Sequence, residues 1–222
     1  MHLGAHMSIA GGVENAVLRG RSVGCEAITM SAHISMNIIA SGKLVVLRAR
    51  LSSDVDACTR WLTRGEWRLF DAPWEDTDVV YTSKQLERYR QKFLEECAQE
   101  LPTPRKRAII VTKDNHPLGR VMRHAQERFP QTWFVGIDIC EDDCLNRGIG
   151  TEALTLWVDY LFGHSDIHHI GLDTWSLNPR MLRVAEKVGF VFEGAQREMI
   201  EWQGRWLNFV HFGLLRPEWK TE

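Results

Sequence analysis

The sequence predicts an α/β (α+β) protein with a mixed, mostly antiparallel sheet of about seven strands, flanked by helices and preceded by a short β-α appendage. Two observations predict it. Three short apolar strands follow one another within residues 107–140 and are separated only by turns, as in an antiparallel meander. Further strands then alternate with two helices that carry clear start signals. We expect the appendage at residues 1–40 and the main domain at residues 43–222.

The bulk composition excludes several classes of protein. The 222 residues suit one sizeable domain with an appendage. The net charge of −2 provides no basic field for nucleic acid, and no run of 18 apolar residues could span a membrane. Five cysteines, an odd number without a regular framework, indicate reduced thiols. We therefore expect a cytoplasmic protein with neither nucleic acid nor membrane as its partner.

The first forty residues form a separate pattern. A short apolar strand is followed by the Gly11-Gly12 break, a helix over about Val13–Val23 and a strand near Ala27–Met30, which together make one β-α-β unit. The segment SMNIIASGK, residues 35–43, then resembles a linker.

The main domain begins with a strand and a short helix. Residues 43–51 alternate between apolar and polar side chains and predict a strand. Ser52 or Ser53 can cap a helix over about 54–63. A loop rich in aromatic and acidic residues follows.

A longer helix then begins at a capping box formed by Thr82 and Gln85. Its apolar residues fall on one face, and they are Leu86, Tyr89, Phe93 and Cys97. The segment LPTP ends it.

The second half supplies most of the sheet. We expect its strands at residues 107–112, 119–126, 132–140, 168–176, 191–195 and 205–216. One helix runs to about Phe162 and ends at Gly163. The next begins with Asn178 as its N-cap and Pro179 at its first position.

A glycine loop connects the strand at 132–140 to the helix that ends at Phe162. Glycines there let backbone N–H groups approach one point, and the helix dipole adds positive potential, so a phosphate is the natural occupant. Gly148 and Gly150 leave room for it, and Arg147 adds a charge. The loop is neither a Walker loop nor a dinucleotide fingerprint, which would need glycine at Ala153. From the loop alone, a tight turn that binds nothing fits equally well.

Three segments carry a resemblance to a known family. They are NRGIGTEALTLWVDYLF, NPRMLRVAEKVGFVFEG and GRWLNFVHFGLLRPEW. They resemble the GNAT family of N-acetyltransferases, most closely its branch with the ribosomal-protein N-terminal acetyltransferases. The resemblance covers about residues 43–222. It implies the GNAT acetyltransferase fold and direct transfer of an acetyl group from acetyl-CoA to a primary amine. The acceptor would be a protein N-terminus or a small amine such as a polyamine, an aminoglycoside or an amino acid.

The resemblance also assigns residues to the acetyl-CoA site. Its pyrophosphate would lie against backbone amides of Leu145, Asn146, Arg147, Gly148, Ile149, Gly150 and Thr151. Its pantetheine arm would pair, as an added strand, with Ile137, Asp138 and Ile139, where the fourth and fifth strands separate. Asn178 would contact the same arm, although it also suits a plain N-cap. Leu145 departs from the family pattern, which has glutamine or arginine there.

The catalytic residues are less defined. Loss of a proton from the acceptor ammonium requires a base, and the candidates are Glu198, Glu201 and Glu193. Many relatives have a tyrosine acid at the position of Ala185, so that acid is missing here. A chain that binds acyl-CoA without catalysis therefore stays an alternative.

Further acidic residues surround the expected site. We expect Glu141, Asp142 and Asp143 to point away from the pyrophosphate. Trp74, Glu75 and Asp76 would suit a cationic amine.

Two other patterns point elsewhere. Cys140, Cys144, His164 and His168 resemble a zinc-finger spacing, but their central gap exceeds the usual ~12 residues, so we expect no metal. Residues 3–29 resemble the first strand and helix of endonuclease IV. One β-α unit cannot make a closed barrel, so DNA repair is a minor alternative and His6 is expected to be structural. The appendage could also support a homodimer through its strand edge.

Overall fold

A computed structural model of the chain describes residues 4–5, 27–28, 38–76, 80–99, 101–126 and 128–219. The chain divides into two compact units, residues 1–38 and 39–222. In the first unit, β1 (Gly4–Ala5) pairs in parallel with β2 (Ala27–Ile28). The helix expected over about Val13–Val23 lies outside the described residues, and so does His6.

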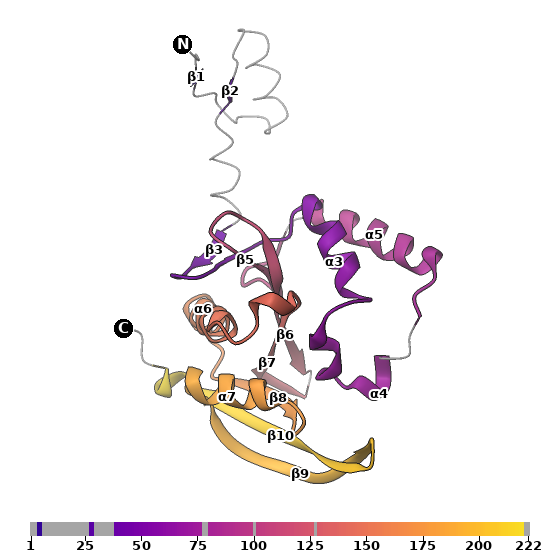
Figure 1. Cartoon of the computed structure of the whole chain (residues 1–222). Helices are drawn as coiled ribbons and strands as arrows, with labels where there is room; N and C mark the ends of the chain where they lie inside the picture. The colour runs from indigo at the N-terminus through magenta and orange to yellow at the C-terminus, as the bar shows by residue number, and fades with distance from the viewer. Residues whose placement is uncertain are drawn as a thin grey trace. The chain divides into compact units, whose positions relative to one another are not determined.

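The second unit is built on an eight-stranded sheet with the order β3-β4-β5-β6-β7-β8-β10-β9 (Figure 1). The strands are β3 (Ile38–Ser41), β4 (Val46–Arg48), β5 (Arg107–Val111), β6 (Pro117–Gln126), β7 (Phe129–Ile139), β8 (His169–Trp175), β9 (Val191–Trp202) and β10 (Arg205–Leu215). The described pairings from β4 to β7 and from β8 to β9 are antiparallel, while β7 and β8 are parallel. This is the expected mixed, mostly antiparallel sheet. The segment expected to be a linker instead contributes β3, which adds an eighth strand.

Helices cover both faces of the sheet (Figure 1). They are α3 (Val55–Trp61), α4 (Pro73–Asp76), α5 (Ser83–Cys97), α6 (Ile149–Gly163) and α7 (Pro179–Val188), with 3-10 turns η1 (Ser52–Asp54), η2 (Glu66–Leu69), η3 (Asp142–Cys144) and η4 (Arg216–Glu218). The α6–α7 pair and the α3–α5 segment lie on opposite sides of the sheet in Figure 1. No helix in this described part is long and apolar enough to span a membrane.

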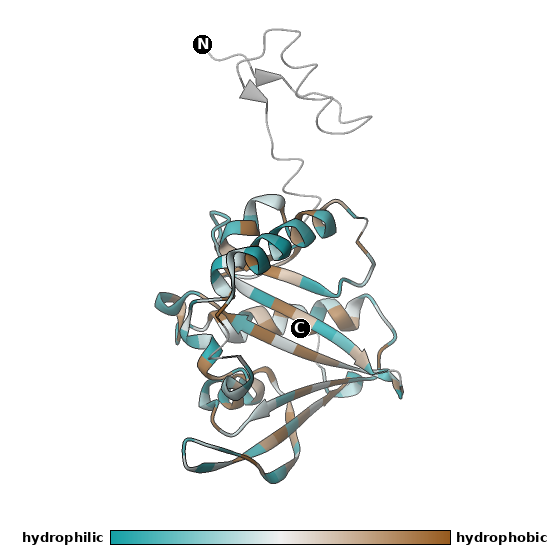
Figure 2. Cartoon of the chain, turned by 90° about the vertical axis from the view of Figure 1, so that its right-hand side faces the viewer, coloured by the Kyte–Doolittle hydropathy of each residue, from teal (hydrophilic) through white to brown (hydrophobic). Residues whose placement is uncertain are grey.

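Two apolar clusters hold these layers together. The larger one places Leu154 and Trp157 of α6 against sheet residues such as Ile110, all fully buried. The smaller one joins Trp61 of α3 and Phe93 of α5 on the other face. Alternation along the strands supplies both faces, and Figure 2 shows apolar and polar residues following one another along the sheet. The sheet is thus covered on both faces by its own helices.

The predicted helix starts are confirmed at α5 and α7. The Gln85 N–H donates to Thr82 Oγ1 at 3.3 Å, and the Thr82 N–H donates to Gln85 Oε1 at 2.8 Å. The Met181 N–H donates to Asn178 Oδ1 at 3.0 Å. The prediction for α3 is wrong: Ser52 and Ser53 lie within η1. Asp54 takes the N-cap position, and its carboxylate binds Arg48 instead of capping the helix.

Candidate active site

The strands β7 and β8 run side by side only at their first residues. Their parallel pairing covers Thr132–Phe134 with His169–Gly171 and then stops. Beyond this point the strands separate, as the resemblance implied, and a cavity of about 370 Å³ opens between them. The backbone groups of β7 that face this opening have no strand partner in the described part of the chain. Because buried backbone groups require hydrogen-bond partners, this edge is suited to an extended ligand.

One half of the cavity is formed by the predicted acetyl-CoA site. Six of the predicted residues line it: Ile137, Asp138, Ile139, Leu145, Gly150 and Asn178. They come from β7, the glycine loop and the start of α7. Asn146, Arg147, Gly148, Ile149 and Thr151 belong to the adjoining loop and the first turn of α6 and do not line the cavity itself.

The glycine loop has the geometry of an anion site. Asn146 and Gly148 have positive φ angles of 59° and 81°, directly before α6 begins at Ile149. The first N–H groups of a helix have no intrahelical acceptor and sit at the positive end of its dipole. A Cβ on Gly150 would lie 3.8 Å from Ile139 and 3.9 Å from Val184. A Cβ would therefore be in ordinary contact with its neighbours, and Gly150 itself lines the cavity.

Asp138 has a role that the sequence did not reveal. Arg120, opposite it on β6, donates from Nε to Asp138 Oδ2 at 2.6 Å. Burial disfavours the charge of Arg120, but the neighbouring carboxylate more than compensates and raises the pKa of the guanidinium. The side chain of Asp138 thus pairs with Arg120 on the neighbouring strand. Its backbone is the part that can bind a ligand.

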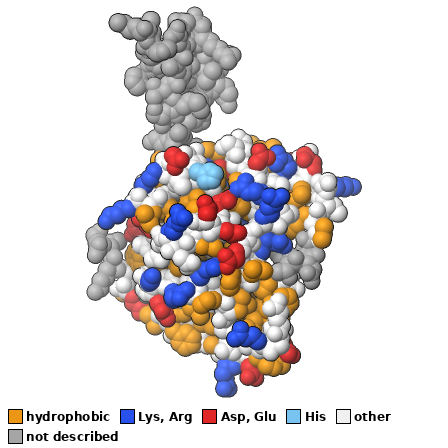
Figure 3. All heavy atoms as spheres, viewed as in Figure 1, with side chains coloured by type: hydrophobic (Ala, Val, Ile, Leu, Met, Phe, Trp, Pro, Cys, Tyr) orange, Lys and Arg blue, Asp and Glu red, His pale blue; other side chains and the backbone are white. Residues whose placement is uncertain are grey.

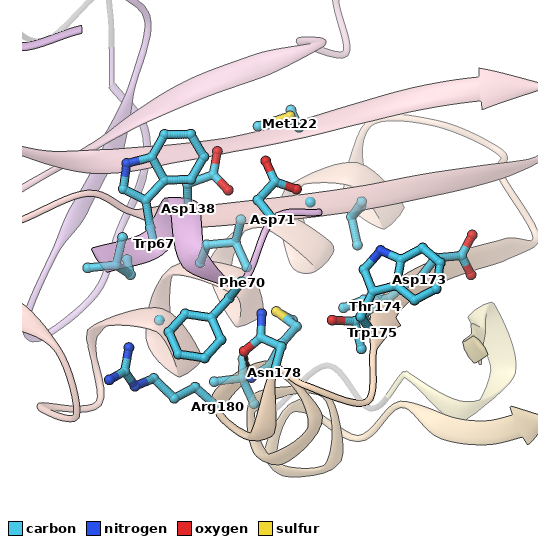
Figure 4. A pocket seen from close by; sticks show the side chains of 18 of the residues that line it. Trp67, Phe70, Asp71, Met122, Asp138, Asp173, Thr174, Trp175, Asn178 and Arg180 are labelled. Carbon is cyan, nitrogen blue, oxygen red and sulfur yellow. Dashed lines mark hydrogen bonds between the residues drawn. The ribbon is translucent and has the colours of Figure 1, made fainter. Parts of the chain in front are cut away.

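The other half of the cavity is lined by residues of β8 and β10 that lie opposite each other across the two strands. Asp173 and Trp175 of β8 lie directly opposite His211 and Phe209 of β10. His211 Nδ1 and Asp173 Oδ1 are 2.8 Å apart, and the rings of Trp175 and Phe209 are 4.7 Å apart. Asp173, Trp175 and Phe209 all line the cavity. Figure 4 shows Asp173 beside Trp175, on the opposite side of the cavity from Trp67 and Phe70.

The segment from η2 to α4 lies across the cavity from Asp173 and Trp175 and covers it. Trp67, Phe70 and Asp71 line the cavity from it. Trp74 of α4 packs edge-on against Trp175 at 4.7 Å and also contacts Trp202 at 6.1 Å. Of the acidic residues predicted here, Glu75 is exposed and does not line the cavity, and the side chain of Asp76 lies outside the description.

Two residues of the acidic stretch before the glycine loop contact α3 and η2. Trp61 Nε1 donates to Glu141 at 2.8 Å, and the Glu66 N–H donates to Asp142 at 2.7 Å. Glu141 also pairs with Arg60. Glu141 and Asp142 therefore point toward α3 and η2, and the expectation that these carboxylates point away from the pyrophosphate stays a prediction.

The charged residues that line the cavity include two ion pairs and two further carboxylates. Each arginine among the described lining residues is matched by a carboxylate: Arg120 by Asp138, and Arg180 by Glu66 at 2.6 Å. Asp71 and Asp173 add two further carboxylates to the lining. The wider surface is mixed, and Figure 3 shows positive and negative side chains interspersed on the face it displays. The carboxylate of Asp173 therefore lies in the lining, where it can attract a cation.

A comparison with known proteins identifies the family. The model of the acetyltransferase (GNAT) domain matches residues 44–191, which is more than half of the chain. The chain belongs to the GNAT family. It is 36% identical over 89 residues to YjcK, a probable N-acetyltransferase of Bacillus subtilis (strain 168). The match spans 40% of this chain and 48% of YjcK, so the chain spans about half the length of this curated relative.

Solved structures show the same GNAT fold. The spermidine N-acetyltransferase of Vibrio cholerae, in complex with CoA and spermine, superposes with a TM-score of 0.60 at 20% identity, covering 78% of this chain and 96% of its own. The ribosomal-protein-S5-alanine acetyltransferase of Vibrio fischeri superposes with a TM-score of 0.61 at 22% identity, covering 82% and 98%.

The three predicted bases of this GNAT chain do not line the cavity. Glu193 lies 3.4 Å from His169 Nε2, where β7 and β8 are still paired. Glu198 and Glu201 are exposed on β9. Asp173 was not among the residues predicted from the sequence, although an acid within the apolar strand HIGLDTW is a signal for it, and His211 has a similar setting on β10.

Among the described residues, no three His, Cys, Asp or Glu side chains come together as metal ligands do. Of the zinc-like set, Cys140 is buried in the smaller apolar cluster beside Trp61, and His168 is exposed.

Proposed function

We propose that the chain transfers an acetyl group from acetyl-CoA to a primary amine by direct transfer, in the cytoplasm. The observation that carries the proposal is the cavity itself. It joins an unpaired strand edge and a helix start on one side to an aromatic half that carries Asp173 on the other. A long anionic carrier and a cationic acceptor can therefore meet within one site.

The residues present fit acetyl-CoA. First-turn N–H groups of α6, with Arg147 exposed beside them, suit the pyrophosphate. The free edge of β7 at Ile137–Ile139 suits the amides of the pantetheine arm. Asn178 uses Oδ1 to cap α7, so its Nδ2 group remains able to donate into the cavity.

Acetyl-CoA, when bound, supplies a thioester carbonyl as the electrophile. A backbone N–H in the unpaired part of β7 can donate to the oxygen of that carbonyl, where negative charge develops. Ala185, at the position of the family tyrosine, is fully buried in the apolar core. The position therefore cannot deliver a proton to the leaving thiolate, which receives one from the acceptor nitrogen instead.

The charge of the cavity selects among the acceptors. An amine arrives as an ammonium ion, which Asp173 and the aromatic faces attract. A free amino acid brings its own carboxylate beside the amine, and these same groups repel it. We therefore favour amines without a neighbouring carboxylate, namely polyamines, amino sugars and peptide N-termini, over free amino acids.

The test begins with a thermal melt in the presence of acetyl-CoA, with ATP and NAD as controls. Acetyl-CoA at about 100 times its Kd should stabilise the fold by ~2.7 kcal/mol. A panel of the four amine classes should then release free thiol, with the amino acids slowest. No shift in the melting temperature of folded protein would refute acetyl-CoA binding. A shift without thiol release for any amine would favour the non-catalytic alternative.

A further inference from the structure

The carboxylate of Asp173 is placed to take part in the chemistry. We propose that Asp173 binds the ammonium of the acceptor and accepts its proton, and that His211 is the positioning residue that holds Asp173 for this step. The proposal rests on the proposed acetyl transfer and replaces the three glutamates expected from the sequence.

The strand geometry puts Asp173 at the opening of the site. Gly171 is the last residue of β8 that pairs with β7, and its partner is Phe134. Asp173 follows two residues later and so projects from the same face of the strand, beside the stretch of β7 whose edge is free. A carboxylate here lies next to the place where the proposed carbonyl donor of β7 and the acceptor must meet.

His211 restrains the direction of this carboxylate. Its Nδ1 is 2.8 Å from Asp173 Oδ1, directly across the β8–β10 ladder. The Phe209 ring packs edge-on against the imidazole with centroids 4.9 Å apart. With Oδ1 engaged by the Nδ1–H tautomer, Oδ2 is the oxygen available to an ammonium group. The side chains of Asp173 and His211 are 27% and 29% exposed, so an acceptor can reach the pair.

The other lining carboxylates are less suited to this step. Asp138 is held by Arg120 at 2.6 Å, so its carboxylate already serves as the counterion of a guanidinium. Asp71 lies on the segment between η2 and α4, outside the central strands. Asp173 is carried by a central strand, which holds it more rigidly than a loop would.

The reaction balances with Asp173 in this role. The ammonium transfers one proton to the carboxylate, and the nitrogen lone pair then forms the N–C bond to the acetyl carbonyl. The C–S bond breaks as the amide forms, and the second nitrogen proton passes to the departing thiolate. The proton on Asp173 returns to solvent, so the products are the acetylated amine, free thiol and one proton.

The test compares Asp173→Asn with the wild type in steady-state thiol release across pH 6–10, using spermidine and a peptide N-terminus as acceptors. Loss of a general base typically costs 10²–10⁴-fold in rate, and we expect at least a 100-fold loss of kcat/KM near pH 7. The loss should shrink toward pH 10, because solution then deprotonates the amine without Asp173. The shift in melting temperature with acetyl-CoA should stay unchanged.

Two further variants separate chemistry from structure. His211→Phe should lower kcat/KM by roughly 10-fold while acetyl-CoA binding is retained, and His211→Gln, which keeps a donor, should restore most of the rate. Glu201→Gln and Glu193→Gln serve as matched controls and should stay within about threefold of the wild type.

Several outcomes would overturn the assignment. Asp173→Asn within threefold of the wild type, or a loss of equal size at every pH, would exclude Asp173 as the proton acceptor. Should Asp173→Asn fail to fold, a rate for His211→Phe equal to that of the wild type would exclude the pair. Thiol release that is absent already in the wild type refutes the proposed function instead, and with it this role.

Discussion

Arg120 Nε donates to Asp138 Oδ2 at 2.6 Å across the β6–β7 ladder, inside the wall of the cavity. The side chain of Asp138 is 14% exposed and that of Arg120 is 31% exposed. Arg120 also stacks over the Trp67 ring, 5.2 Å from its centroid. The pair therefore connects β7, which is expected to bind the pantetheine arm, to the segment from η2 to α4 that covers the cavity.

The variant Asp138→Asn distinguishes the contribution of the Asp138 side chain from that of its backbone. The variant leaves Arg120 without a counterion in a half-buried position, so we expect the free energy of unfolding to fall by about 1–3 kcal/mol. Acetyl-CoA affinity should change less than threefold, because the backbone edge of β7 is retained. Chemical denaturation and calorimetric titration measure the two effects. A tenfold loss of affinity would show that the carboxylate itself contacts the ligand.

The space beside Gly150 can be filled by substitution. The two side chains nearest to an added Cβ, Ile139 and Val184, lie at ordinary contact distance, so Gly150→Ala should bind acetyl-CoA almost as the wild type does. Gly150→Val places branched methyl groups into the cavity and should weaken binding at least tenfold with the fold retained. Titration of both variants checks this, and normal binding by Gly150→Val would remove the pyrophosphate assignment.

Glu152 provides a second test of the loop's surroundings. Its carboxylate accepts hydrogen bonds from the backbone N–H groups of Lys43, Leu44 and Val45, at 2.8, 2.7 and 2.8 Å. The interaction anchors the β3–β4 turn to the first turn of α6. Glu152→Ala should lower the free energy of unfolding by about 2 kcal/mol. Glu186→Ala, an exposed change on α7, is the control and should stay within ~0.5 kcal/mol; equal effects would contradict the anchoring role.

The ion pair of Arg48 and Asp54 is buried, with both side chains 2% exposed. Two hydrogen bonds, 2.7 and 2.8 Å long, join the guanidinium to the carboxylate. Asp54→Ala strands the arginine charge and should cost about 3–5 kcal/mol. The double variant Arg48→Met with Asp54→Leu should cost less than Asp54→Ala alone, since no charge stays buried. Urea unfolding tests this, and a double variant that costs as much as Asp54→Ala or more would contradict it.

Cys58 predicts how stability responds to alkaline pH. Burial raises the pKa of its thiol to about 12, from an ordinary value near 9. Above pH 9 the unfolded chain loses this proton while the folded chain keeps it, so stability falls as pH rises, by about 1.4 kcal/mol per pH unit. The stability advantage of the wild type over Cys58→Ala should therefore shrink by ~2 kcal/mol between pH 9 and 10.5. Parallel stability curves for the two proteins would contradict it.

Local signals in the amino-acid sequence predicted most helices and strands, and the three matching segments predicted the family. Capping residues such as Thr82 and Asn178 satisfy helix N–H groups within a few positions of the chain, so their signals can be seen without the fold. The meander over residues 107–140 and the glycine loop before α6 are local in the same sense. The resemblance then ordered these parts into one sheet.

Which side chains line the cavity depends on the tertiary structure. Asp173 meets His211 because β10 returns beside β8, and Trp74 meets Trp175 because the α4 segment covers the same strand. The segment expected to be a linker became β3 through pairing with β4. The candidate bases Glu193, Glu198 and Glu201 lie outside the cavity lining, because distance along the chain says nothing about which side chains face a gap between two strands. Such contacts depend on how strands that are distant in the sequence pair and separate, which is decided by the packing of the whole domain.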